Sequence, residues 1–166
     1  MTDGRPQAGD GRDFTPADYN TVTANAKLIA VTLLKSTVEI KPEFFDPSTK
    51  KKLGYDTDVM TSRYDSDEGS ISAFFRFAVD GKVGRKTQLK IYAEYLVVYA
   101  SEPGLNQDAA EAFCEHVGLY ASYPYFRAWV SQAASAGNLR LPPLPSLSSV
   151  GRLAPGLRRK IQKADA

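Results

Sequence analysis

The stretch that decides the fold runs from residue 116 to residue 147 and reads HVGLYASYPYFRAWVSQAASAGNLRLPPLPSL. Pro124 stands where a helix can begin, because a proline in the first turn of a helix sacrifices no hydrogen bond. Gly137 stands where that helix should end, since glycine accepts the left-handed backbone of a helix cap. Phe126 and Trp129, three residues apart, fall on one helix face. Aromatic side chains this large either bury in a core or bind a partner.

The same stretch resembles the C-terminal signature of the SecB family of protein-export chaperones. That family combines an aromatic-Pro-Tyr-x-Arg motif, a glycine stop and an apolar Leu-x-Leu-x-Pro ending, which residues 123–127, Gly137 and residues 139–145 match. The family order, four antiparallel strands and then two helices, can be laid on residues 26–147. The resemblance implies an α+β fold in which a four-stranded antiparallel sheet carries two C-terminal helices on one face.

The local patterns divide the chain into three parts. Residues 1–20 are rich in Gly, Pro, Asp and Thr and are expected to be disordered, residues 21–150 form the domain, and residues 151–166 form a basic tail. Within the domain, apolar runs and period-two alternation predict strands at 26–40, 55–63, 70–79 and 87–99. A turn is expected at 65–70 and a hairpin connection at 80–86. A helix is predicted over 105–119, with Asn106 as its N-cap.

Composition narrows the class of protein. At 166 residues the chain is long enough for a single core. Cys114 is the one cysteine in the sequence, so no intramolecular disulfide is possible and a reducing compartment is expected. No run is long enough for a membrane span, and the first residues lack an apolar signal region. These features predict a soluble, cytoplasmic protein.

Strand alternation separates two faces of the predicted sheet. One face of the last two strands is apolar throughout and should be the core face. The opposite face mixes apolar and charged side chains, which suits a subunit interface, although the N-terminal segment could cover it instead. This mixed face and one stripe of the 105–119 helix together predict a homo-oligomer, most simply a dimer of dimers. The predicted interface residues are Phe74, Tyr92, Leu96, Val98, Ala109, Phe113, Val117 and Tyr120.

Binding is the function that the aromatic residues indicate. In SecB proteins the connection after the first strand crosses toward the second helix, and the groove between them holds unfolded chains. The resemblance therefore implies a molecular chaperone whose clients are non-native polypeptides, bound with little sequence preference because contact area carries the energy. The alternative is that the helix aromatics are core. The predicted client-binding residues are Phe44, Phe45, Leu53, Tyr55, Tyr123, Tyr125, Phe126 and Trp129.

Catalytic and metal-binding functions find no support in the residues. His116 is the one histidine, and it lies two positions from Cys114, on a different helix face. No metal set, phosphate loop, nucleophile elbow or dinucleotide fingerprint is present, so neither an enzyme nor a cofactor is expected.

Charge bears on the partners. SecB proteins contact the SecA export motor through an acidic sheet surface, whereas residues 35–43 carry two lysines and two glutamates. A dedicated client such as an antitoxin is therefore a candidate partner beside the export motor. The tail at 151–166 holds five basic residues and one acidic residue. An adaptor or nucleic-acid-associated protein using this tail is the alternative function, although nucleic acid is not the expected partner.

Overall fold

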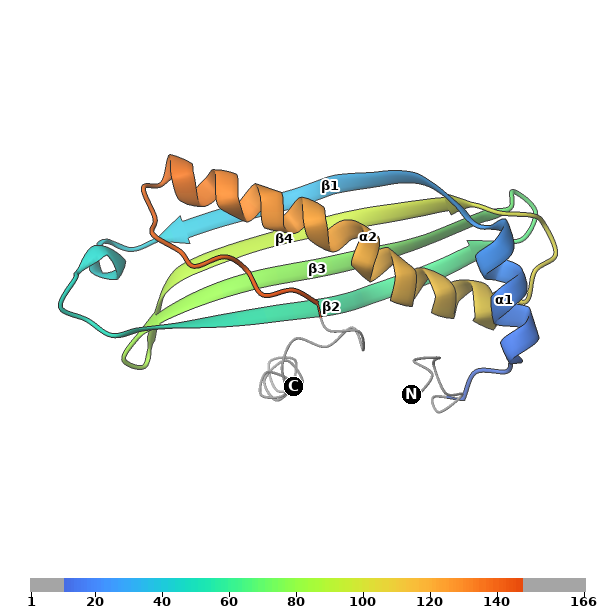
Figure 1. Cartoon of the computed structure of the whole chain (residues 1–166), viewed down its shortest axis with the longest axis horizontal. Helices are drawn as coiled ribbons and strands as arrows, with labels where there is room; N and C mark the ends of the chain where they lie inside the picture. The colour runs from blue at the N-terminus through green and yellow to red at the C-terminus, as the bar shows by residue number, and fades with distance from the viewer. Residues whose placement is uncertain (1–10, 148–166) are drawn as a thin grey trace.

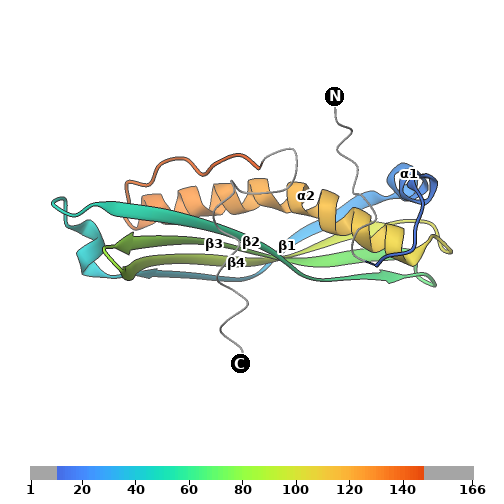
Figure 2. The same cartoon turned by 90° about the horizontal axis from the view of Figure 1, so that it is seen from below.

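The fold is one antiparallel sheet with helices on a single face (Figures 1 and 2). The structure, a computed structural model, describes residues 11–147. The strands lie in the order β1-β4-β3-β2, so β1 and β2 are the edges. The elements are α1 (Pro16–Asn25), β1 (Lys27–Ile40), the 3₁₀ turn η1 (Pro42–Phe45), β2 (Lys51–Asp65), β3 (Ser70–Val83), β4 (Lys86–Ala100) and α2 (Gln107–Ala136). This arrangement confirms the predicted α+β fold.

The predicted pair of C-terminal helices is wrong, because α2 is continuous over 30 residues and contains Pro124 in its interior. An interior proline removes a backbone hydrogen bond and costs about 3 kcal/mol. Packing on both sides of the proline offsets that cost: the rings of Tyr123 and Phe126 lie 5.8 and 5.1 Å from the ring of Phe77. The predicted cap at Asn106 is confirmed, since its side chain accepts a hydrogen bond from the backbone of Ala109 at 2.9 Å.

The N-terminal segment is more ordered than its composition suggested. Residues 16–20, expected to be disordered, form the first half of α1, which Thr15 begins with a capping box closed by Asp18. Val22 is buried, and Tyr19 packs its ring 6.1 Å from Phe113 of α2. The N-terminal segment therefore packs on α2 rather than across the opposite face of the sheet. Residues 1–10 and the predicted tail at 151–166 lie outside the described residues.

The core forms where the alternation predicted it. Alternate side chains of β3 and β4, from Ile71 to Val79 and from Leu89 to Tyr99, are buried beneath α2. Gly118 lets α2 lie directly on the sheet, because a Cβ there would stand 2.8 Å from Cζ of Phe75. The third and fourth strands are longer than predicted: Asp80 pairs with Lys90, and the turn shrinks to Gly84 and Arg85.

Charges of opposite sign alternate on the face of the sheet that faces away from α2, here called the outer face. Register places Lys35, Glu94, Arg76 and Asp58 in one row across all four strands. Arg76 approaches Glu94 at 3.6 Å. Opposite charges on neighbouring strands stabilise a solvated sheet face. The predicted interface residues Phe74, Tyr92, Leu96 and Val98 lie half-buried on this face.

Asp56, on the outer face of β2, is expected to destabilise the fold when ionised. Burial raises the pKa of its carboxyl, and the charges of Asp58 and Asp80 add to this, whereas a backbone hydrogen bond from Thr57 and the charge of Arg76 act the other way. A raised native pKa means that the native state binds the proton more readily than the unfolded chain, so stability falls as pH rises through that pKa. Asp56→Asn should raise the melting temperature at neutral pH. The difference in melting temperature between the variant and the parent should vanish near pH 3, below the usual aspartate pKa of about 3.9. Melting curves of both proteins at the two pH values measure it.

The long helix crosses the sheet diagonally (Figure 1). Near its start, Glu115 accepts a hydrogen bond from Ser62 of β2, and at its end Gly137 lies against Ile40 of β1. A diagonal helix leaves two corners of the sheet uncovered by α2, one over the start of β2 and one over the start of β1. The two corners differ in what lies over them, and each bears on function.

Candidate functional site

The corner over β2 is covered by residues 138–147, here called the strap, which run back over the sheet between α2 and β2 (Figure 1). The reversal occurs directly after α2. Asn138 has φ 51°, whereas Gly137 has φ −87°. The helix thus ends at the predicted glycine, but the left-handed residue is the asparagine that follows it, a residue type that tolerates this conformation.

Leucines hold the strap to the domain. Leu139 and Leu144 are buried, and Leu141 and Leu147 pack half-buried against the core. The Tyr123 hydroxyl donates a hydrogen bond to the backbone carbonyl of Pro145. The sequence motif that suggested the family therefore lies across a groove in the fold.

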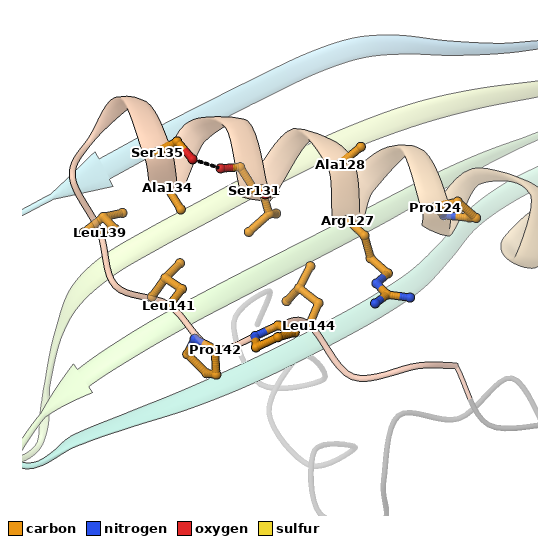
Figure 3. Close-up of a pocket in the computed structure, with 12 residues that line it drawn as sticks. Pro124, Arg127, Ala128, Ser131, Ala134, Ser135, Leu139, Leu141, Pro142 and Leu144 are labelled. Atoms are coloured by element: carbon orange, nitrogen blue, oxygen red, sulfur yellow. Dashed lines mark hydrogen bonds between the residues drawn. The ribbon is translucent and has the colours of Figure 1, made fainter.

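A cavity of about 500 Å³ remains between α2 and the strap (Figure 3). Its size lies within the range of ligand pockets, roughly 300–1,000 Å³. Most of the lining is apolar or small, and polar groups come from Arg127, Ser131 and Ser135. The Arg127 side chain reaches from α2 toward Leu144 of the strap (Figure 3). Such a site can hold apolar side chains and pair its one cation with a carboxylate or a carbonyl.

Two tyrosines, Tyr55 of β2 and Tyr123 of α2, lie close to each other on the helix side of the sheet. Burial raises the pKa of Tyr123; the charge of Arg127 lowers it, and Tyr55 raises it slightly. Tyr55 and Leu53 stand opposite Val79 and Gly81, and so project from β2 toward the helix side. The structure thus brings Tyr55 close to Tyr123, which contacts the strap, and places Leu53 on the same face of β2 as Tyr55.

The other aromatic residues of α2 have different roles. Phe126 is 2% exposed and stacks on Phe77, so its predicted place in a binding groove is wrong and the core alternative holds for it. Tyr123 is also buried at its ring, although its hydroxyl reaches the strap. Tyr125 is 54% exposed and Trp129 half-buried, and neither lines the cavity.

The two adjacent phenylalanines of η1 also differ in burial, one being buried and the other exposed. Phe44 is 5% exposed and lies over Gly81, where a Cβ would stand 2.5 Å from its ring. Phe45 is 48% exposed and meets the Phe44 ring edge-on at 6.4 Å. The prediction that both project into a groove is wrong for Phe44, which anchors η1 to the sheet. Phe45 stays a predicted binding residue.

Two predicted interface residues on α2 are also internal. Ala109 is fully buried, and the ring of Phe113 packs 5.2 Å from Tyr99. The same spacing that suggested an interface stripe instead faces the sheet and α1. Val117 and Tyr120 are half-buried.

The corner over β1 stays open and is apolar. The large hydrophobic side chains exposed on β1 are Leu28, Ile29, Leu33, Leu34 and Val38. Ile29 and Leu34 sit at irregularities of the pairing with β4, where the register shifts. The sequence predicted a strand here because the run is too apolar for a surface loop. Its place at the sheet edge, which the sequence does not state, is what leaves it exposed.

Cys114 is buried in α2, and burial raises the pKa of its thiol to about 12, with a smaller contribution from Glu115. The thiol is therefore protonated at neutral pH. We expect negligible reaction of the native protein with a thiol reagent at pH 8, and full reaction after denaturation, because the thiolate is the nucleophile. Rapid labelling of the native chain would contradict this assignment.

Within residues 11–147, no group of three or more His, Cys, Asp or Glu side chains is placed to hold a metal ion. None of the helices in this range is long and apolar enough to cross a membrane.

The fold is similar to that of a solved chaperone. The SecB-like chaperone Rv1957 of Mycobacterium tuberculosis, in complex with a ChAD peptide from the antitoxin HigA1, superposes with a TM-score of 0.66 at 14% sequence identity. The match covers 80% of this chain and 97% of that chain. At the sequence level, no protein-family model and no curated protein matches. The chain has a SecB-like fold.

Proposed function

We propose that this protein is a SecB-like molecular chaperone that binds non-native polypeptides and keeps them soluble. The observation that carries the proposal is the cavity of about 500 Å³ between α2 and the strap, whose lining is mostly apolar or small and which has Tyr55 and Tyr123 nearby. The similarity of the whole fold to a chaperone solved with a bound peptide supports it. Extended segments suit such a site, because contact area rather than sequence provides the binding energy.

The client is proposed to be a dedicated partner rather than the general export pathway. The alternating charges on the outer face, from Lys35 to Asp58, offer a motor no uniformly acidic surface. The similar chaperone holds a peptide from an antitoxin. A short, unfolded segment of an antitoxin-like protein is therefore the partner that we propose, in the cytoplasm.

The protein is also proposed to be a homo-oligomer, assembled as a dimer of dimers. An apolar edge strand with free backbone groups pairs readily with another strand. The exposed leucines and isoleucine of β1 supply such an edge. Pairing two copies through β1 would bury this surface and leave the groove beside β2 open to clients.

The test is suppression of aggregation when a urea-denatured reporter enzyme is diluted into buffer with the protein, followed by light scattering. Suppression should be stoichiometric and should persist at high salt, because apolar capture does not depend on ion pairs. Phe45→Ala should weaken suppression and leave the melting temperature unchanged, since an exposed aromatic anchor is typically worth about 2 kcal/mol in binding. Absence of suppression by the parent protein would refute the proposal.

The same salt titration tests the alternative, an oligomeric adaptor or nucleic-acid-associated protein using the basic tail at 151–166. Binding through phosphates weakens steeply as salt rises. A partner that dissociates in this way, and that a protein shortened after residue 150 no longer binds, would favour the alternative.

A further inference from the structure

The strap is attached firmly only at its beginning. The backbone N–H groups of Asn138 and Leu139 donate to the carbonyls of Ser135 and Ala134, at 3.2 and 2.8 Å. Beyond them, among residues 11–147, no backbone hydrogen bond joins residues 140–147 to another segment, and the Tyr123 hydroxyl provides the one side-chain hydrogen bond to this stretch. Residues 140–147 are therefore held mainly by apolar side-chain contacts.

Prolines keep the strap from becoming part of the sheet. Pro142, Pro143 and Pro145 have no N–H group, so the strap cannot supply the regular donors of a β-strand, and it lies on the helix side of the sheet (Figure 2). It remains an extended segment whose leucines enter the groove at positions 139, 141 and 144. An unfolded polypeptide bound in the same groove would make contacts of this kind.

The strap also fills its groove incompletely. The cavity between it and α2 is lined by strap residues on one side and by α2 residues on the other. Strap side chains that face this opening bury less apolar surface than they would in close packing, so the free energy that holds the strap is smaller. A segment with larger apolar side chains would fill the space better.

We propose that the strap is a built-in competitor for the client groove, and that clients bind by displacing it. This inference rests on the proposed function. The preferred client is an extended, leucine-rich segment whose apolar residues take the places of Leu139, Leu141 and Leu144. Arg127, at the cavity wall, favours a client with an acidic residue nearby.

The experiment weakens the strap in two ways. Leu144→Ala removes a buried strap side chain, and Tyr123→Phe removes only the hydroxyl that binds Pro145, which keeps the test valid if the first variant unfolds. Tyr19→Phe is the matched control, because α1 lies at the opposite end of the sheet from the strap (Figure 1). Two probes are titrated by fluorescence anisotropy: a labelled peptide with the sequence of residues 138–147, and a labelled, permanently unfolded reporter protein.

Both probes should bind Leu144→Ala about tenfold more tightly than the parent, because apparent affinity rises with the fraction of molecules whose groove is open. Tyr123→Phe should give a smaller gain, seen with the unfolded reporter but not with the peptide, because the peptide loses the same hydrogen bond to Tyr123 as the strap. The control should give no gain with either probe. Equal or weaker binding of the unfolded reporter by the strap variants would overturn the inference, since the strap would then be a wall of the groove. Capture of the reporter by none of the proteins, with peptide binding to Leu144→Ala retained, would overturn the proposed function instead.

Discussion

Phe126→Ala is expected to lower the free energy of unfolding by about 3–5 kcal/mol, the usual cost of removing a buried aromatic side chain. Phe126 is 2% exposed and stacks between Phe77 and Trp129, at ring distances of 5.1 and 6.4 Å. The truncation removes contacts on both sides of the ring. It also removes packing that keeps α2 continuous past Pro124. Urea titration monitored by circular dichroism measures the change.

Tyr125→Ala, the neighbouring position, is the matched control. Tyr125 is 54% exposed, and substitutions on the surface usually change stability by less than about 0.5 kcal/mol. The two variants remove aromatic rings of similar size from consecutive positions of one helix. If both variants lost stability equally, or if Phe126→Ala lost little, the assignment of Phe126 to the core would be wrong.

The sheet could be predicted from the sequence because its signal is local. Alternation from Ile71 to Val79 and from Leu89 to Tyr99 has the period of a strand with one buried face, and burial follows it residue by residue. The cap at Asn106 was equally readable, since a cap is set by residues within one turn.

The sequence predicted two C-terminal helices where the structure has one, because the contacts that decide this join residues distant in sequence. Pro124 is a favourable first residue of a helix, and local rules placed a helix start there. The packing of Tyr123 and Phe126 on Phe77, nearly fifty residues earlier, outweighs that preference. The fate of the adjacent Phe44 and Phe45 likewise depends on Gly81, whose missing side chain makes room for one ring.

The sequence showed which residues make up the candidate site but not how they are arranged in space. The leucines and prolines of residues 139–145 were recognised as a motif, yet nothing in their spacing shows that they turn back at Asn138 and cover a groove. The exposure of β1 was missed for a related reason. An apolar strand is usually central, and its edge position follows only from the strand order.

Ile29→Lys with Leu34→Lys is expected to break the contact between copies through β1 and so to lower the mass of the assembled protein. Both side chains are exposed on the edge strand, at 63% and 49%, and both sit where the pairing with β4 is irregular. Lysines on an edge strand oppose pairing with a second strand. In a two-fold symmetric interface each substitution acts twice, and a central apolar anchor is typically worth about 2 kcal/mol or more.

Light scattering coupled to size-exclusion chromatography measures the mass of each variant. Phe74→Ser, on the outer face, is the control that separates the two candidate interfaces, because that face carries the other set of predicted contacts. If β1 joins the copies, the lysine variant has a lower mass than the parent and Phe74→Ser keeps the parent's mass. Dissociation by Phe74→Ser alone would move the interface to the outer face. A parent protein that is monomeric at micromolar concentration would exclude both, and the exposed edge of β1 would then need another partner.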